Sequence, residues 1–238
     1  MYRIDAYHRP TSVAEAVDLL AAPTRSALAG GTAIRHDGGA TPTEVVDLQA
    51  LGLDEIEAER DIVRIGAMAR LSAVAEHEAV PDLVRRAARG EMPSTLRTLA
   101  TVGGTIGTAA SDSVFLAALL VHDASVHFAD GGSIALSSVL HDGLAAGELI
   151  VAVEVQPSGP TALAATGRTP ADDPIVAAVA RSADDGIRLA LCGVGPTPEL
   201  VDVGDLDRLE PPADFRGSTA YRRHLARVLS ARVLEELS

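Results

Sequence analysis

The chain has 238 residues, of which 47% are apolar, so it can bury a sizeable core and is not a disordered polymer. Its 33 acidic and 20 basic side chains give a formal charge of −13, which opposes binding to nucleic-acid phosphates or anionic lipid surfaces. The longest apolar run, residues 114–121, is far shorter than the ~20 residues of a membrane-spanning helix. The single cysteine, Cys192, cannot form an internal disulfide, and the first ten residues lack the apolar region of a secretory signal. We therefore expect a cytoplasmic protein that neither binds nucleic acid nor inserts into a membrane.

The first two thirds of the chain are expected to contain short strands and helices in mixed order. Thr11 or Ser12 begins a predicted helix that ends before Pro23, with Glu15 as the capping-box acid. Alternating or β-branched residues and turn signals predict the elements that follow. These are strands near residues 26–29, 44–48 and 62–68, helices over 71–80, 82–90 and 113–123, a hairpin over 124–136 and a strand over 148–157.

A second unit is expected after Pro157. Residues 158–174 are rich in loop-forming residues and predict a linker or an element that crosses between the two units. Two strands joined through Asp184, Asp185 and Gly186 follow, and residues 220–237 predict an amphipathic helix. Its arginines, Arg222, Arg223, Arg227 and Arg232, are interpreted as a solvated face. The fold class is therefore α+β.

Two glycine-rich segments, residues 29–33 and 101–108, are the strongest candidates for ligand binding. Glycine lets backbone N–H groups converge, and threonine adds hydroxyl donors, so paired loops of this kind can surround a pyrophosphate without a positive side chain. Neither segment matches GxGxxG opening a helix or GxxxxGK[ST], which disfavours a Rossmann or P-loop site. Taken alone, each glycine pair is more often a tight turn.

Eight segments in order between residues 7 and 234 support a more specific interpretation. They are YHRPTSVAEAVDLL, LAGGTAI, VVDLQAL, IVRIGAMARLSAV, LRTLATVGGTIGTAASDS, ELIVAVEVQP, IRLALCGVGPTP and DFRGSTAYRRHLARVLSARVL. Together they resemble the FAD-binding (medium) subunit of the molybdenum hydroxylases, the xanthine and carbon monoxide dehydrogenase family.

The resemblance implies an architecture and a set of partners. It implies a vanillyl-alcohol-oxidase-type FAD-binding domain in two lobes over residues 1–157. A smaller C-terminal domain with a three-stranded sheet and helices is implied over residues 160–238. The expected partners are a small [2Fe–2S] subunit and a large molybdopterin subunit, with FAD passing electrons to an external acceptor.

The same resemblance implies the cofactor-binding residues. Ala29, Gly30, Gly31, Thr32, Ala33 and Ile34 match the first loop around the FAD pyrophosphate, and Ala100, Thr101, Gly104, Thr105 and Gly107 match the second. Asp112 matches the acidic residue that holds the adenosine ribose, and Leu149 and Ile150 match apolar residues beside the flavin ring. No catalytic base and no metal site are expected in this chain, because the cofactor carries the redox chemistry.

Departures from the family pattern leave an alternative open. The first loop continues into a polar stretch over residues 35–40, and the segment before Asp112 is shorter by two residues. Arg168 stands where a lysine and an aromatic residue normally approach the flavin, and it is either a substitute cation or a solvated loop arginine. The alternative function is a flavin-free scaffold or assembly subunit of the same fold. Cys192 is interpreted as a small core residue of the C-terminal sheet.

Overall fold

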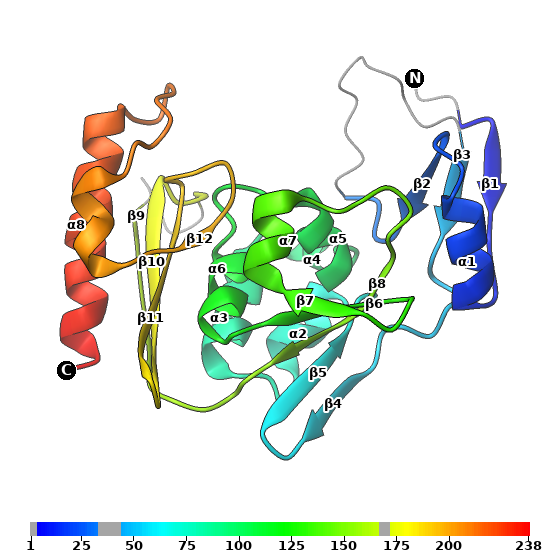
Figure 1. The fold of residues 1–238 in the computed structure, drawn as a ribbon, viewed down its shortest axis with the longest axis horizontal. Coiled ribbons are helices and arrows are strands. Elements are labelled where there is room, and N and C mark those ends of the chain that lie inside the picture. Colours follow the sequence, from blue (N-terminus) through cyan, green and yellow to red (C-terminus); the bar gives the residue numbers. More distant parts are fainter. Residues whose placement is uncertain (1–3, 33–43, 167–171) are drawn as a thin grey trace.

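The computed structural model describes residues 4–32, 44–166 and 172–238. Three sheets follow one another along the long axis of the molecule (Figure 1). A three-stranded sheet with one helix forms one end, a five-stranded sheet with several helices forms the centre, and a four-stranded sheet with the C-terminal helix forms the other end. This mixed helix and sheet architecture confirms the α+β class.

The first lobe is a small parallel sheet covered by one helix. Its strands are β1 (Ala6–His8), β2 (Arg25–Leu28) and β3 (Glu44–Asp47), in the order β1-β3-β2, and its helix is α1 (Val13–Leu20). The predicted capping box is present, because the Ser12 hydroxyl accepts from the Glu15 N–H and the Glu15 carboxylate accepts from the Thr11 N–H. Ala16 and Leu20 of α1 pack with Val46 in a small core.

The central sheet is antiparallel and has the order β4-β5-β8-β6-β7. Its strands are β4 (Ile56–Glu59), β5 (Ile62–Gly66), β6 (Ser125–Phe128), β7 (Ser133–Ala135) and β8 (Ile150–Val155). The predicted hairpin is confirmed: β6 pairs with β7, Gly131 has a φ of +89°, and the Gly132 N–H donates to Asp130. Gly131 supplies the left-handed conformation that this turn requires.

Five helices pack with the central sheet to form the main core. They are α2 (Leu71–Glu76), α3 (Asp82–Gly90), α5 (Val102–Thr108), α6 (Val114–Val121) and α7 (Leu136–Asp142). The short helix α4 (Ser94–Arg97) buries no residue and lies against α2 and α3. Helix α6 is buried from Phe115 to Val121, as expected for a helix that is apolar on all sides. The expectation of a loop over residues 101–108 is wrong, because Thr101 caps a helix whose Val102 and Ile106 enter the core.

The C-terminal sheet has the order β12-β11-β10-β9. Its strands are β9 (Thr161–Thr166), β10 (Val176–Ala183), β11 (Gly186–Cys192) and β12 (Glu199–Leu200), followed by the 3-10 helix η1 (Val203–Arg208) and α8 (Thr219–Glu236). The turn between β10 and β11 is confirmed. Two expectations need correction: the proposed linker contains β9, which pairs along β10, and the sheet has a fourth, two-residue strand.

Helix α8 also corrects one interpretation. Arg222 is 5% exposed rather than solvated, because its guanidinium donates to the carbonyl oxygens of Ile175 and Gly193 and to Asp214. Cys192 is fully buried, as expected, and burial raises the pKa of its thiol to about 12. A thiol with this pKa is a core group and not a nucleophile.

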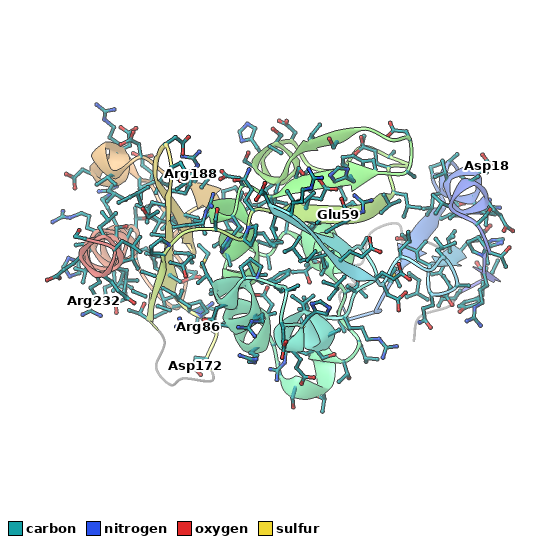
Figure 2. All side chains as sticks on the ribbon, turned by 90° about the horizontal axis from the view of Figure 1, so that it is seen from below. Asp18, Glu59, Arg86, Asp172, Arg188 and Arg232 are labelled. Atoms are coloured by element: carbon teal, nitrogen blue, oxygen red, sulfur yellow. The ribbon has the colours of Figure 1, made fainter. Side chains whose placement is uncertain are left out.

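A buried arginine joins the C-terminal sheet to the central unit. Arg181 of β10 donates to the carbonyl oxygens of Val121 and Ser158 and to the Asp123 carboxylate. Arg188 of β11 donates to the same carboxylate and lies between the sheet and the central helices, whereas Arg232 lies on the far side on α8 (Figure 2). Across the described parts of the chain, no helix is long and apolar enough to cross a membrane.

Candidate functional site

A cavity of about 440 Å³ lies between the first lobe and the central unit. Its volume is within the range of small-molecule and cofactor sites. The first glycine segment and its strand contribute Ser26, Ala27, Ala29, Gly30, Gly31 and Thr32, and α5 with its cap contributes Thr101, Gly103, Gly104, Gly107 and Thr108. The remaining wall consists of Leu48, Ala67, Met68, Leu144, Glu148, Leu149 and Ile150. The fold thus brings both predicted glycine segments to one cavity.

The first glycine segment lines this cavity and has unused backbone donors. The N–H groups of Gly30, Gly31 and Thr32 have no acceptor among the described residues. Gly31 has a φ of +69°, the left-handed conformation in which successive N–H groups turn toward one point. Three neighbouring N–H donors of this kind suit an anionic group such as a phosphate.

Gly30 also allows the first glycine segment to pack closely against the chain that leads into α5. A Cβ atom at Gly30 would lie 1.9 Å from the Leu99 carbonyl oxygen. Residue 30 must therefore be glycine for the first segment to lie against the chain that enters α5. This contact holds the two glycine segments on opposite sides of the same cavity.

The second segment offers a bare helix face and not free donors. The N–H groups of Val102 and Gly103 donate to the carbonyl oxygens of Ala69 and Ala67, and the Gly104 N–H donates to the Thr101 hydroxyl. A Cβ at Gly107 would have its nearest neighbour, Leu144 Cδ1, 3.8 Å away, so the face of α5 at this position is open. A ligand can approach this face closely, but it gains few backbone hydrogen bonds from it.

Part of the cavity wall is apolar. Leu48, Met68 and Leu149 are at most 8% exposed and belong to one small core cluster, and Ile150 begins β8 directly after Leu149. Leu144, from the chain after α7, also lines the cavity. The wall therefore combines the backbone donors of the first glycine segment with apolar side chains around Leu149.

Some predicted residues lie behind the wall or elsewhere. Ala100 and Thr105 are buried, and they support α5: the Ala100 carbonyl accepts from Leu71, and the Thr105 hydroxyl donates to the Thr101 carbonyl. Asp112 does not line the cavity, and its carboxylate pairs with Arg216 at 3.1 Å. Ala33, Ile34 and Arg168 lie outside the described residues.

Sequence reasoning missed part of the wall. Ser26, Leu48, Met68, Leu144 and Glu148 line the cavity, although none belongs to a glycine-rich segment. Glu148 directly precedes Leu149, which the resemblance predicted as a site residue. This adjacency was the one sequence signal that could have pointed to Glu148. Leu48 and Met68 read as core residues in the sequence, because only the approach of two lobes opens a cavity between them.

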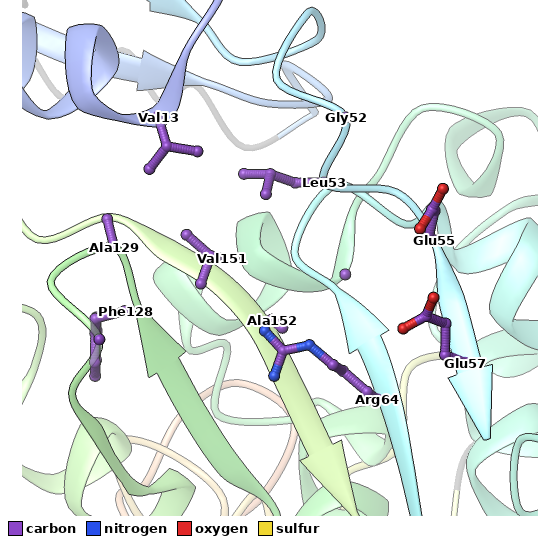
Figure 3. A pocket seen from close by; sticks show the side chains of 12 residues that line it. Val13, Gly52, Leu53, Glu55, Glu57, Arg64, Phe128, Ala129, Val151 and Ala152 are labelled. Carbon is purple, nitrogen blue, oxygen red and sulfur yellow. The ribbon is translucent and has the colours of Figure 1, made fainter. Parts of the chain in front are cut away.

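A second hollow, of about 340 Å³, lies next to the outer face of the central sheet (Figure 3). Val13 and Leu53 face Val151 across it, and the Arg64 side chain extends over Ala152. Arg64 pairs with Glu154 at 2.7 Å, and none of the predicted cofactor residues lines this hollow. Its one basic lining residue is therefore already paired, and this hollow is not our candidate site.

The described residues contain no cluster of three or more His, Cys, Asp or Glu side chains placed to hold a metal ion. One carboxyl group outside the cavity has unusual electrostatics. Burial raises the pKa of Glu91 to about 7, although the Ser113 hydroxyl and the Phe115 N–H bind its carboxylate at the start of α6. Glu91 therefore titrates near neutral pH.

Comparison with known proteins identifies the class. The family model of the FAD binding domain in molybdopterin dehydrogenase matches residues 2–157, well over half of the chain. The chain belongs to this family, as the sequence resemblance implied, and FAD is the cofactor of its domain.

Individual relatives match almost the whole chain. The uncharacterised protein YgfM of Escherichia coli K12 is 30% identical over 250 residues, covering 96% of this chain and 94% of YgfM. The CO dehydrogenase of Hydrogenophaga pseudoflava has a TM-score of 0.88 at 22% identity, covering 99% of this chain and 97% of that one. Reconstituted CO dehydrogenase from Oligotropha carboxidovorans has a TM-score of 0.85 at 25% identity, covering 100% and 99%. Quinoline 2-oxidoreductase from Pseudomonas putida 86 has a TM-score of 0.85 at 21% identity, covering 100% and 98%.

Proposed function

We propose that this chain is the FAD-carrying electron-transfer subunit of a molybdenum hydroxylase-type dehydrogenase. In this role it accepts electrons from [2Fe–2S] clusters of a partner and passes them through FAD to an external acceptor. The observation that carries the proposal is that both glycine segments and the apolar residues around Leu149 line one cavity. A dinucleotide needs both kinds of contact, because it has a charged pyrophosphate and ring systems with apolar faces.

The first segment would hold the pyrophosphate. Gly30, Gly31 and Thr32 line the cavity, their N–H groups have no acceptor among the described residues, and the Thr32 hydroxyl adds a further donor. Gly104 and Gly107 on α5 leave room for the ligand on the opposite wall. A protein with a net charge of −13 can bind an anion here because neutral backbone donors, and not basic side chains, surround it.

The apolar residues of the wall would contact the flavin ring. Leu149 and Ile150 lie at the start of β8, with Met68 and Leu48 beside them, so the ring would be shielded from water on this side. Bound FAD supplies electron transfer, and the protein residues bind, orient and shield it. Ala33 and Ile34 continue the first segment, and their roles remain as proposed from the resemblance.

The family membership supports the proposed assembly. A domain whose relatives occur in molybdopterin dehydrogenases is expected to act with a small [2Fe–2S] subunit and a large molybdopterin subunit. The division at residues 157–160 and the cytoplasmic location also remain predictions.

The test is whether the purified full-length protein contains FAD. We expect a yellow protein with a visible flavin absorbance band, and release of FAD on denaturation, identified by chromatography. Apoprotein should regain the band when FAD is added. A colourless protein that excess FAD cannot reconstitute would refute the proposal and favour the flavin-free scaffold.

A further inference from the structure

Glu148 is the one ionisable side chain among the described residues that line the cavity. It lies directly before Leu149, an apolar residue of the cavity wall, and in the same loop as Leu144. All other described lining groups are apolar side chains, glycines or hydroxyl-bearing residues. Glu148 is exposed, so water screens its charge in the ligand-free protein, and a ligand that covers the carboxylate would strengthen its electrostatic effect.

The loop holds this side chain in place and leaves half of its carboxylate available. Glu148 Oε2 accepts from the Ala145 N–H at 2.8 Å, and the Glu148 N–H donates to the Ala145 carbonyl oxygen at 3.2 Å. Glu148 Oε1 has no partner within the described parts of the chain. One oxygen thus fixes the side chain against its own turn, and the other remains an acceptor.

The chemistry of FAD restricts what this acceptor can bind. A carboxylate repels phosphate, so Glu148 is unsuited to the pyrophosphate, which belongs with the N–H groups near Gly31. The apolar side chains around Leu149 suit the ring system, and the oxidised isoalloxazine ring carries a single N–H, at N3 on its pyrimidine edge. Carboxylate oxygens accept hydrogen bonds from such groups strongly.

Resting on the proposed function, we propose that Glu148 Oε1 accepts a hydrogen bond from the flavin N3–H and positions the pyrimidine edge of the ring. The negative charge of Glu148 then faces the part of the ring that gains negative charge on reduction. This arrangement makes reduction less favourable and lowers the midpoint potential of the bound flavin. Glu148 is thus both a binding residue and a determinant of the potential.

The experiment compares full-length apoprotein with its E148Q and E148A variants, titrated with FAD and with FAD methylated at N3. Wild-type protein should bind the methylated cofactor about tenfold more weakly than FAD, and E148A should bind both with similar, weaker affinity. E148Q should keep FAD affinity within about threefold, because an amide oxygen still accepts the N–H. Its midpoint potential should nevertheless rise, because the charge is gone.

Asp130→Asn is the matched control. Asp130 also accepts a backbone N–H within an exposed turn, from Gly132, but it does not line the cavity, so D130N should leave affinity and potential unchanged. Equal wild-type affinity for the two cofactors, together with an unchanged potential in E148Q, would overturn the role of Glu148. Failure of the wild-type protein to bind FAD at all would instead overturn the proposed function and this inference with it.

Discussion

Substitution of Gly107 separates cofactor binding from folding, because it should raise the stability of the apoprotein and lower its affinity for FAD. Gly107 is an exposed residue within α5, and a Cβ there has no heavy atom closer than Leu144 Cδ1 at 3.8 Å. Alanine or leucine is favoured over glycine in a helix interior by about 0.8–1 kcal/mol. Because Gly107 is close to the end of a seven-residue helix, we expect about 0.5 kcal/mol of added stability, or roughly 1–2 °C in Tm.

The same substitution places a side chain in the cavity. Gly107→Leu should fill space that the cofactor needs and weaken FAD binding at least tenfold, which corresponds to about 1.4 kcal/mol. Gly107→Ala should have a smaller effect on affinity. The measurements are thermal unfolding of the apoprotein and titration of FAD by fluorescence quenching.

Gly90→Leu is the matched control for this experiment. Gly90 is the last residue of α3, a Cβ there meets nothing within 4 Å, and it does not line the cavity. G90L should leave FAD affinity unchanged. Normal FAD affinity in G107L, with the apoprotein as stable as expected, would refute the placement of the cofactor against α5.

Two further predictions concern carboxyl groups outside the cavity. Burial raises the Glu91 pKa to about 7, so folding stability contributed by its protonated form is present at low pH and is lost as pH rises from about 4.5 to 7. The free energy of unfolding of E91Q, measured relative to the wild type in urea, should therefore rise by about 1–3 kcal/mol between pH 5 and pH 8. The same difference between the two proteins at both pH values would contradict this prediction. From the family resemblance of Asp112, we expect Asp112→Ala to weaken the free energy of FAD binding by roughly 1–3 kcal/mol. If this variant binds FAD normally but melts at a lower temperature, Asp112 serves only the ion pair with Arg216.

Much of the secondary structure was predictable because its causes are local. The capping box of Ser12 and Glu15 and the Gly131 turn depend on residues only a few positions apart. Strand β9 was not predictable in this way. Its residues, Thr161–Thr166, are small and flanked by loop formers, and pairing along β10 makes them a strand. The helix over Val102–Thr108 contains three glycines, and its contacts with the core override their poor helix propensity.

The sequence by itself indicated the family, and it singled out two glycine-rich segments and, through the family resemblance, the Leu149–Ile150 pair as candidates for a ligand site. Only the tertiary structure decided the part that each residue plays. Gly30 is required for contact with Leu99, Gly107 leaves the helix face open, Asp112 pairs with Arg216, and Glu148 faces the cavity. The physical reason is that a motif specifies conformations over a few residues. Which groups are already hydrogen-bonded, and which remain free for a ligand, depends on contacts between segments far apart in the chain.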